Sequence, residues 1–313
     1  MRASATSRSS RKLPRLPRIN VRVGLLIVFM LLLAVCSIQP LASSPSLPPL
    51  STVSGSARLV GKFVWADLVT DNATAASGFY ADLFGWTFHS AGDYVIMANA
   101  DHPICGILQR SRPKDGSAKP HWFGYISTKS VEGAQREVTR LGGRVLAAPQ
   151  KFPERGEQAV FADPEGAIFG VIKSSSGDPQ DFKPDPGDWV WIQLLSHDAS
   201  RASEFYKAVA AYQVVENIEN NRLNDFVLVS EGYARATVRT IPKERAQVKP
   251  DWLLYVRVSN ITESVARARQ LGGQVLFEPR PDYLHGRVAI IRDPTGAAVG
   301  LLEWSDELLR RGQ

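Results

Sequence analysis

Aromatic rings and a few polar groups recur at matching places in this chain of 313 residues, and they are the side chains best suited to chemistry. Indole and phenol rings beside one or two polar groups are typical walls of a small-molecule site. The alternative is that these rings only pack a hydrophobic core. A role for the one carboxylate among them as a general base has little support, because no neighbour in the sequence is placed to tune its pKa. The candidate ligand-binding residues are Trp65, Asp67, Trp122, Tyr125, Trp191, Gln193, Trp252 and Tyr255.

Metal ligands and nucleophiles do not gather in the sequence. A bound metal needs several nitrogen, oxygen or sulfur atoms that converge on one point. The five histidines are scattered, with no His-x-His or His-x3-His spacing. Cys36 and Cys105 are the only cysteines, so no disulfide forms within the body, and Cys105 is interpreted as a small buried hydrophobe. We expect no catalytic metal and no cofactor, and the residues for any catalysis stay unknown.

The net charge of +6 lies in the first residues of the chain. Residues 1–22 hold seven basic side chains and no acidic one, which leaves a balance of −1 over the other 291 residues. A body of that charge has no overall electrostatic reason to bind phosphate, so we expect no nucleic-acid partner. With 44% apolar residues the chain is globular rather than disordered.

An apolar segment with the pattern of a membrane-targeting signal follows the basic stretch. Residues 23–36 carry no charge, and a positive segment before an apolar run of about 7–15 residues is the pattern of a secretory signal. The run is short for a bilayer span of about 20 residues but is long enough for an uncleaved anchor where the bilayer thins. Basic residues before the run predict a cytoplasmic N-terminus and an exported body, on the periplasmic or extracellular face.

Cys36 ends the apolar run, and residues 33–36 (LAVC) resemble a bacterial lipobox, whose cysteine becomes lipidated. Val35 departs from the pattern, where Gly, Ala or Ser is usual. Residues 41–44 (LASS) offer an ordinary cleavage region instead. Lipoprotein, uncleaved anchor and cleaved signal all stay open for residues 1–36.

The body is a tandem repeat. Residues 119–170 align with 249–300 without a gap, and 17 of the 52 aligned residues are identical. Upstream, Trp65 and Tyr80 align with Trp191 and Tyr206. A Ser/Pro-rich stretch at 37–58 predicts an extended tether, and a second breaker-rich run at 174–187 predicts a linker. The domains are then 59–173 and 188–305.

Each copy is predicted to contain two modules of strand, helix and three strands. The first module has strands expected near 63–70, 86–89, 94–99 and 104–109, with a helix closed by Gly85. The second has strands near 122–128, 144–148, 158–162 and 167–173, with a helix that ends at Gly142. Asn72 and Asn260 precede helices and are interpreted as N-caps.

These residues resemble the vicinal oxygen chelate superfamily, which includes glyoxalases, bleomycin-resistance proteins and extradiol dioxygenases. The resemblance is carried by residues 63–71 (FVWADLVTD) and 79–86 (FYADLFGW), the Leu-Gly-Gly helix ends and the paired Asp-Pro-x-Gly turns, and it covers about 60–304. It implies an α+β fold of two glyoxalase-like domains, each built from paired βαβββ modules that form a cup of curved sheet.

Metal-dependent members of that family take His or Glu ligands from the first strand of each module and from the strand that closes the sheet. The resemblance places the closing positions at Gly170 and Gly300 and the equivalent ones in the other modules at Gly106 and Ala236. His121 lies one residue from a ligand position, but its repeat partner is Asp251. The first-strand positions are Val64 or Trp65, Trp122 or Phe123, Val190 or Trp191, and Trp252 or Leu253. None of these slot residues holds a divalent cation through its side chain.

We therefore expect a membrane-tethered, exported protein that binds a small organic ligand without a metal. The alternatives are a metal-dependent lyase, isomerase or dioxygenase and a scaffold whose cups are filled. The oligomeric state stays unknown.

Overall fold

The computed structural model describes residues 47–51, 55–92, 94–111, 119–216 and 225–304. The leader, with Cys36 and its three alternatives, lies outside them. Over the described ranges no helix is both long and apolar enough to cross a membrane.

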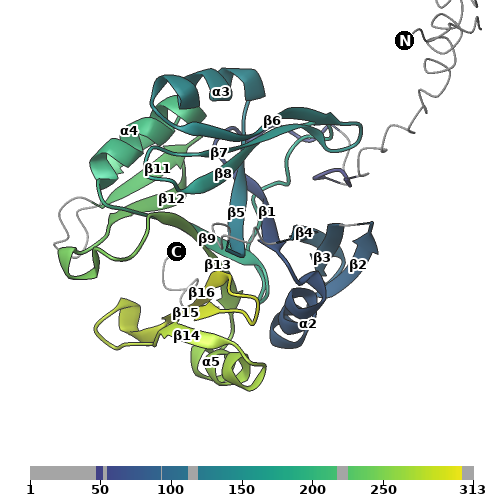
Figure 1. Cartoon of the computed structure of the whole chain (residues 1–313), viewed down its shortest axis with the longest axis vertical. Helices are drawn as coiled ribbons and strands as arrows, with labels where there is room; N and C mark the ends of the chain where they lie inside the picture. Colours follow the sequence, from purple (N-terminus) through teal and green to yellow (C-terminus); the bar gives the residue numbers. More distant parts are fainter. Residues whose placement is uncertain (1–46, 52–54, 93, 112–118, 217–224, 305–313) are drawn as a thin grey trace, which may run out of the picture. The chain divides into compact units, whose positions relative to one another are not determined.

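The first copy folds into one eight-stranded sheet (Figure 1). β1 and β5 pair antiparallel at its centre, and the last strand of each module lies parallel to the first. The strand order is β2-β3-β4-β1-β5-β8-β7-β6. The elements are β1 (Phe63–Thr70), α2 (Ala73–Phe84), β2 (Thr87–Ala91), β3 (Tyr94–Asn99), β4 (His102–Gln109), β5 (His121–Ser127), α3 (Val131–Arg140), β6 (Arg144–Phe152), β7 (Gly156–Ala162) and β8 (Ile168–Ser174).

The second copy repeats this topology in the order β10-β11-β12-β9-β13-β16-β15-β14. β9 and β13 form its antiparallel centre. The predicted α+β fold of paired βαβββ modules is confirmed. The elements are β9 (Trp189–Ser196), α4 (Ala199–Ala210), β10 (Gln213–Glu216), β11 (Phe226–Ser230), β12 (Tyr233–Thr240), β13 (Asp251–Val258), α5 (Ile261–Gln270), β14 (Gln274–Phe277), β15 (Val288–Arg292) and β16 (Ala298–Glu303), with short 3-10 turns at Lys243–Arg245 and Leu284–Gly286.

Local chemistry fixes the helix ends. The Oδ1 atoms of Asn72 and Asn260 accept from the backbone of Ala75 and Glu263, so both predicted N-caps are confirmed. Gly85 closes α2 in the left-handed region, at φ 77°. Its counterpart after α4 is Ala211, which adopts φ 58° without the freedom of glycine.

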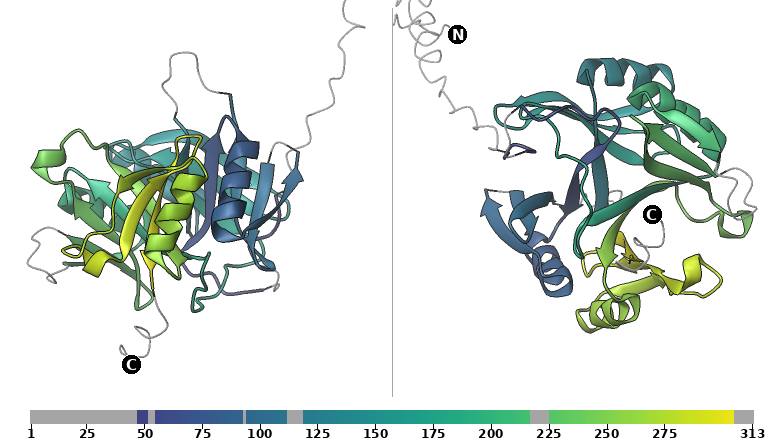
Figure 2. Two further views of the ribbon diagram at one scale, coloured as in Figure 1. Left: turned by 90° about the horizontal axis from the view of Figure 1, so that it is seen from below. Right: turned by 180° about the vertical axis from the view of Figure 1, so that it is seen from behind.

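The two sheets meet through the faces that carry their helices. α3 lies against α4, and α2 lies beside α5 (Figures 1 and 2). One hydrophobic core runs through both copies at this junction. Tyr80 of α2 donates to Asp293 Oδ2 (2.9 Å), and Tyr206 of α4 donates to Asp163 Oδ2 (3.1 Å). Each Asp-Pro-x-Gly turn is thus held by a tyrosine of the other copy.

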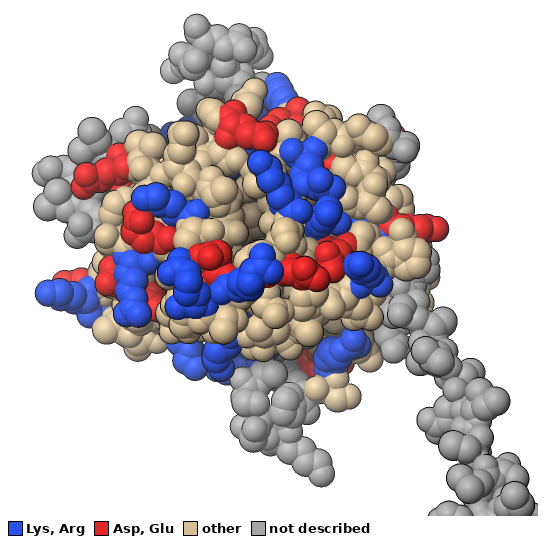
Figure 3. Space-filling view, turned by 90° about the horizontal axis from the view of Figure 1, so that it is seen from above, with Lys and Arg blue, Asp and Glu red and all other residues tan. Residues whose placement is uncertain are grey.

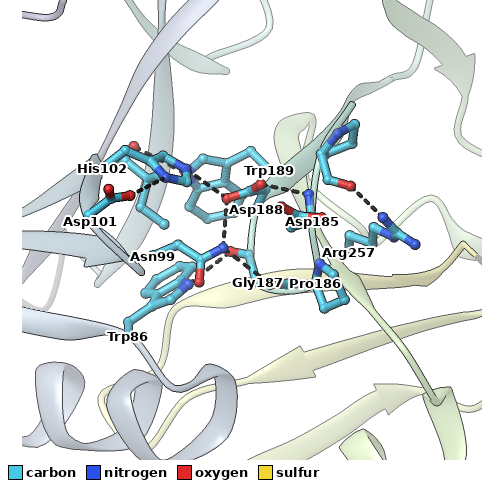
Figure 4. Close-up of polar contacts among 12 residues, drawn as sticks. Trp86, Asn99, Asp101, His102, Asp185, Pro186, Gly187, Asp188, Trp189 and Arg257 are labelled. Carbon is cyan, nitrogen blue, oxygen red and sulfur yellow. Dashed lines mark hydrogen bonds and ion pairs between the residues drawn. The ribbon is translucent and has the colours of Figure 1, made fainter. Parts of the chain in front are cut away.

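The connection between β8 and β9 is held against the first sheet (Figure 4). Asn99 Nδ2 donates to Asp188 Oδ1 (2.7 Å), and His102 Nε2 lies 3.0 Å from the same oxygen. Trp86 Nε1 donates to the carbonyl of Gly187 at 2.8 Å. The run predicted as a linker is therefore fixed at its end by side chains of the first copy.

Candidate functional site: two cups, one filled and one open

We call the helix-free face of each sheet its cup. Strand alternation puts Trp65 and Asp67 of β1 on this face, paired with Tyr125 and Phe123 of β5. The second cup has Trp191 and Gln193 of β9, paired with Tyr255 and Leu253 of β13. The structure thus brings together six of the eight candidate residues, three in each cup.

The expectation that Trp122 and Trp252 line a cup is wrong. They are one residue out of phase with the cup positions and lie in the core between the sheets. Trp122 Nε1 donates to Tyr80 Oη and Trp252 Nε1 donates to Tyr206 Oη, both at 2.8 Å. The alternative considered for these rings, core packing, is what the structure shows for both.

Cys105 is also in that core and is fully buried, as predicted. Burial, followed by the charge of Asp67, raises the pKa of its thiol well above the ordinary value. The residue is therefore not an activated nucleophile.

A tyrosine fills the floor of the first cup. Tyr94 lies over Gly106, where a Cβ atom would come within 2.0 Å of its ring. Asp67 Oδ1 accepts from Tyr94 Oη (2.6 Å) and Trp65 Nε1 (2.9 Å), and its Oδ2 accepts from Tyr125 Oη (3.1 Å). Burial and the Asp67 charge raise the pKa of both tyrosines. This carboxylate is held by three donors, which leaves it poorly placed to act as a base.

The tether also enters the first cup. Leu47 and Leu50 are each 7% exposed and belong to the cluster that contains Trp65, Tyr94 and Phe123. The expectation that residues 37–58 form an extended, unpacked tether is therefore corrected for residues 47–51. Two leucines in an otherwise Ser/Pro-rich segment find apolar surface to bury, and burial of such side chains contributes about 1.5–3 kcal/mol each.

The second cup is open and holds a cavity of about 450 Å³. Its lining combines aromatic rings with polar and charged side chains. The lining includes Trp191, Gln193, Asp225, Thr237, Arg239, Tyr255, Tyr283, His285, Val288 and Leu302.

Three replacements explain why the second cup is open. Asp67 pairs with Gly106 and Gln193 pairs with Thr237, so Thr237, not Ala236 as predicted, is the counterpart of Gly106. The same register puts Asp225 at the position of Tyr94 and Arg239 at the position of Leu108. The ion pair of Asp225 and Arg239 therefore stands where the first cup has Tyr94, whose ring covers the floor of that cup.

Hydrogen bonds already link the polar and aromatic side chains of the open cup. Arg239 Nε donates to Asp225 Oδ2 at 2.9 Å, and Arg239 Nη1 donates to Tyr283 Oη. Trp191 Nε1 donates to Thr237 Oγ1 at 3.1 Å. Tyr255 Oη donates to Gln193 Oε1 at 3.1 Å, and no described residue accepts a hydrogen bond from Gln193 Nε2. Burial, then the nearby Tyr283, raises the pKa of Tyr255.

The metal of the chelate enzymes does not fit either cup. A Cβ atom at Gly170 would lie 2.3 Å from the ring of Tyr125, and one at Gly300 would lie 2.2 Å from the ring of Tyr255. A tyrosine thus fills the space that a closing-strand ligand would need. Among the described residues no three His, Cys, Asp or Glu side chains gather to hold an ion. His121 is the first residue of β5, with Nδ1 2.8 Å from the carbonyl of Lys119.

Residue types alone did not point to Asp225, Arg239, Tyr283 and His285 as lining the open cup. The repeat offered one signal for His285, because this residue aligns with Arg155 of the first copy at the offset of 130. For Asp225 and Arg239 the offset is 131, because Gln193 and Thr237 are five residues further apart in the sequence than Asp67 and Gly106, although the two pairs occupy the same place in the sheet.

A second hollow, of about 490 Å³, lies between α3 and α4 and is lined by Arg140, Leu141, Pro164, Arg201, Glu204, Phe205 and Ala208. Figure 3 shows the end of the molecule that carries these helices, where acidic and basic side chains are interspersed. The hollow shares no residue with either cup.

Comparison with known proteins agrees with this architecture. Residues 62–171 match the model of the Glyoxalase/Bleomycin resistance protein/Dioxygenase superfamily, and residues 189–302 match that of the Glyoxalase-like domain. The chain belongs to this superfamily, as a member with two tandem domains.

Relatives and solved structures resemble it at low identity. The anthracycline biosynthesis protein DauV of Streptomyces sp. strain C5 is 28% identical over 259 residues, which cover 78% of this chain and 93% of that protein. A Mn(II)-bound glyoxalase from Novosphingobium aromaticivorans matches with a TM-score of 0.53 and 15% identity over 78% of this chain and 82% of that one. Homoprotocatechuate 2,3-dioxygenase from Arthrobacter globiformis matches with a TM-score of 0.54 and 13% identity over 82% and 83%. The structural likeness supports the fold alone.

Proposed function

We propose that the second cup binds a small organic molecule without a metal ion, in a body tethered at the outer face of a membrane. The observation that carries the proposal is the cavity of about 450 Å³ in the second cup, at the place where Tyr94 and the tether fill the first. Ligand pockets of proteins usually measure about 300–1,000 Å³.

The walls indicate what kind of molecule would fit. Trp191, Tyr255 and Tyr283 offer aromatic surface for a flat ring system. Gln193 Nε2 and the guanidinium of Arg239 offer donors to a carbonyl or hydroxyl oxygen. The relative DauV is named for anthracycline biosynthesis, so an anthracycline is the first probe to try.

Thermal unfolding of the purified protein with the anthracycline, and with a panel of planar aromatic metabolites, tests the binding proposal. A ligand at 100 times its Kd stabilises the native state by about 2.7 kcal/mol and raises Tm. The control is the triple variant Asp225→Tyr, Thr237→Gly, Arg239→Leu, which copies the side chains of the first cup into the second. It should keep the fold, because the same set of residues is already accommodated in the repeat, and it should lose the ligand-induced rise in Tm. An unchanged rise in the triple variant would place the ligand elsewhere.

Metal analysis separates binding from the enzyme alternative. We expect less than stoichiometric Zn, Fe, Mn, Ni and Co in the purified protein, and an unchanged Tm with a chelator. One tightly bound equivalent per domain, lost together with stability or activity on chelation, would favour a lyase, isomerase or dioxygenase and would overturn the proposal.

The membrane location is supported by the basic stretch and the apolar run of residues 23–36. Full-length protein should fractionate with membranes, and its body should be cleaved by protease added outside the cell or spheroplast. Cys36→Ser separates the alternatives: release of the protein indicates lipidation, while retention with an unprocessed leader indicates an anchor. Recovery of the full-length chain from the soluble cytoplasmic fraction would contradict both.

A further inference from the structure

A buried arginine in the first cup lacks the partners that its burial requires. Arg155, in the turn between β6 and β7, is 1% exposed, and its Cζ lies 4.1 Å from the centre of the Trp65 ring. Its Nε and Nη2 atoms have no hydrogen-bond partner in the described part of the chain. A buried guanidinium is costly unless its N–H groups are bonded, so these two donors point to a missing acceptor.

The two unpartnered donors share one edge of the guanidinium. Nε–H and one Nη2–H are parallel, and this edge matches the two oxygens of a carboxylate. Asp67 does not serve as that carboxylate, because it accepts from Trp65, Tyr94 and Tyr125 and makes no bond to Arg155. A carboxylate that pairs with this edge would therefore come from outside the described residues of the cup.

The apolar part of the same cup is occupied by a removable segment. Leu47 and Leu50 pack against the aromatic cluster around Trp65, but residues 47–51 belong to no strand or helix. The segment is held at its end by Ser51, whose backbone N–H donates to Ser176 Oγ at 3.1 Å. Its release would expose aromatic surface without breaking a strand pairing of the sheet.

We propose that the first cup is a second binding site, for a small organic carboxylate with an apolar body, and that residues 47–50 are its built-in competitor. The carboxylate pairs side-on with Arg155, and the apolar body takes the place of Leu47 and Leu50. This site does not depend on the function proposed for the second cup.

Calorimetric titration of the full chain with benzoate tests the site, with benzyl alcohol as the neutral probe of similar size. Leu47→Ala with Leu50→Ala weakens the competitor, so benzoate should bind at least about tenfold more tightly than to the wild type, which corresponds to about 1.4 kcal/mol. Arg155→Met in the same background should abolish benzoate binding, and Arg155→Lys should restore it only in part, because an ammonium lacks the paired edge. Benzyl alcohol should not respond to the change at Arg155.

Arg269→Met is the control, since it removes an exposed guanidinium of α5 that lies outside both cups and should leave benzoate binding unchanged. Arg239→Met shows whether benzoate binds in the second cup instead. Hydrogen exchange gives an independent readout that needs no leucine variant: benzoate should speed exchange at Ser51 and Leu50 in the wild type. Benzoate binding that survives Arg155→Met, or that is lost in Arg239→Met, would overturn the proposal. So would equal affinity of the wild type and the leucine variant together with unchanged exchange at Ser51.

Discussion

The hydroxyl of Tyr80 is expected to hold the two domains together, and Tyr80→Phe tests this. Tyr80 is fully buried in α2 and bonds to both copies at once. It donates to Asp293 Oδ2 at 2.9 Å and accepts from Trp122 Nε1 at 2.8 Å. Phenylalanine keeps the ring and its packing, so the substitution removes the two hydrogen bonds and little else.

The size of the loss follows from these two bonds. A hydrogen bond to a charged group contributes about 1.5–3 kcal/mol, and a buried donor left without a partner costs about 1–3 kcal/mol. Asp293 Oδ1 keeps its bonds to the backbone of Thr295, Gly296 and Ala297, which limits the loss on that side. We expect Tyr80→Phe to lower the free energy of unfolding by about 3 kcal/mol, or Tm by roughly 6–12 °C for a body of this size.

Urea and thermal unfolding measure this loss, with Tyr206→Phe as the symmetric variant and Tyr233→Phe as the control. Tyr206 makes the equivalent bonds to Asp163 and Trp252, so its loss should be similar. Tyr233 is 59% exposed, and its substitution should change stability by less than about 0.5 kcal/mol. Equal effects of Tyr80→Phe and Tyr233→Phe would refute the assigned role.

Further predictions concern the backbone, a cup and pH. Ala211→Gly should stabilise the protein by about 0.5–1 kcal/mol, because Ala211 has the left-handed conformation that Gly85 supplies in the first copy; a lower Tm would contradict this. Gly170→Ala should cost about 1–3 kcal/mol in urea unfolding, because its methyl group meets the Tyr125 ring, and a neutral effect would show that the ring moves freely. Burial raises the pKa of Asp163 above 3.8, although hydrogen bonds from Ala167, Tyr206 and Glu165 act to lower it. The protonated carboxyl therefore stabilises the fold at low pH, and this stabilisation is lost as the pH rises through the raised pKa. The stability of the wild type relative to Asp163→Asn should therefore fall as the pH rises from below 3.8 through the raised pKa, and a rise would contradict the sign.

The sequence alone determined the repeat, the module order and the helix ends. These follow from local features that survive any packing, such as the period of apolar residues in the helices, the capping side chains of Asn72 and Asn260, and Gly85. Alternation also placed Trp65 and Asp67 on one face of their strand, because side chains of a strand alternate whatever the sheet meets.

Only the tertiary structure decided which face of each sheet is a cup and which cup is open. Trp122 and Trp252 have the composition of a binding wall, but the packing of the two sheets through their helix faces buries them in the core. Tyr94 and Leu50 fill the first cup from elsewhere in the chain, while Asp225 and Arg239 leave the second open. Such long-range filling depends on strand register and on where a distant segment finds apolar surface, and neither is written in the local pattern of residues.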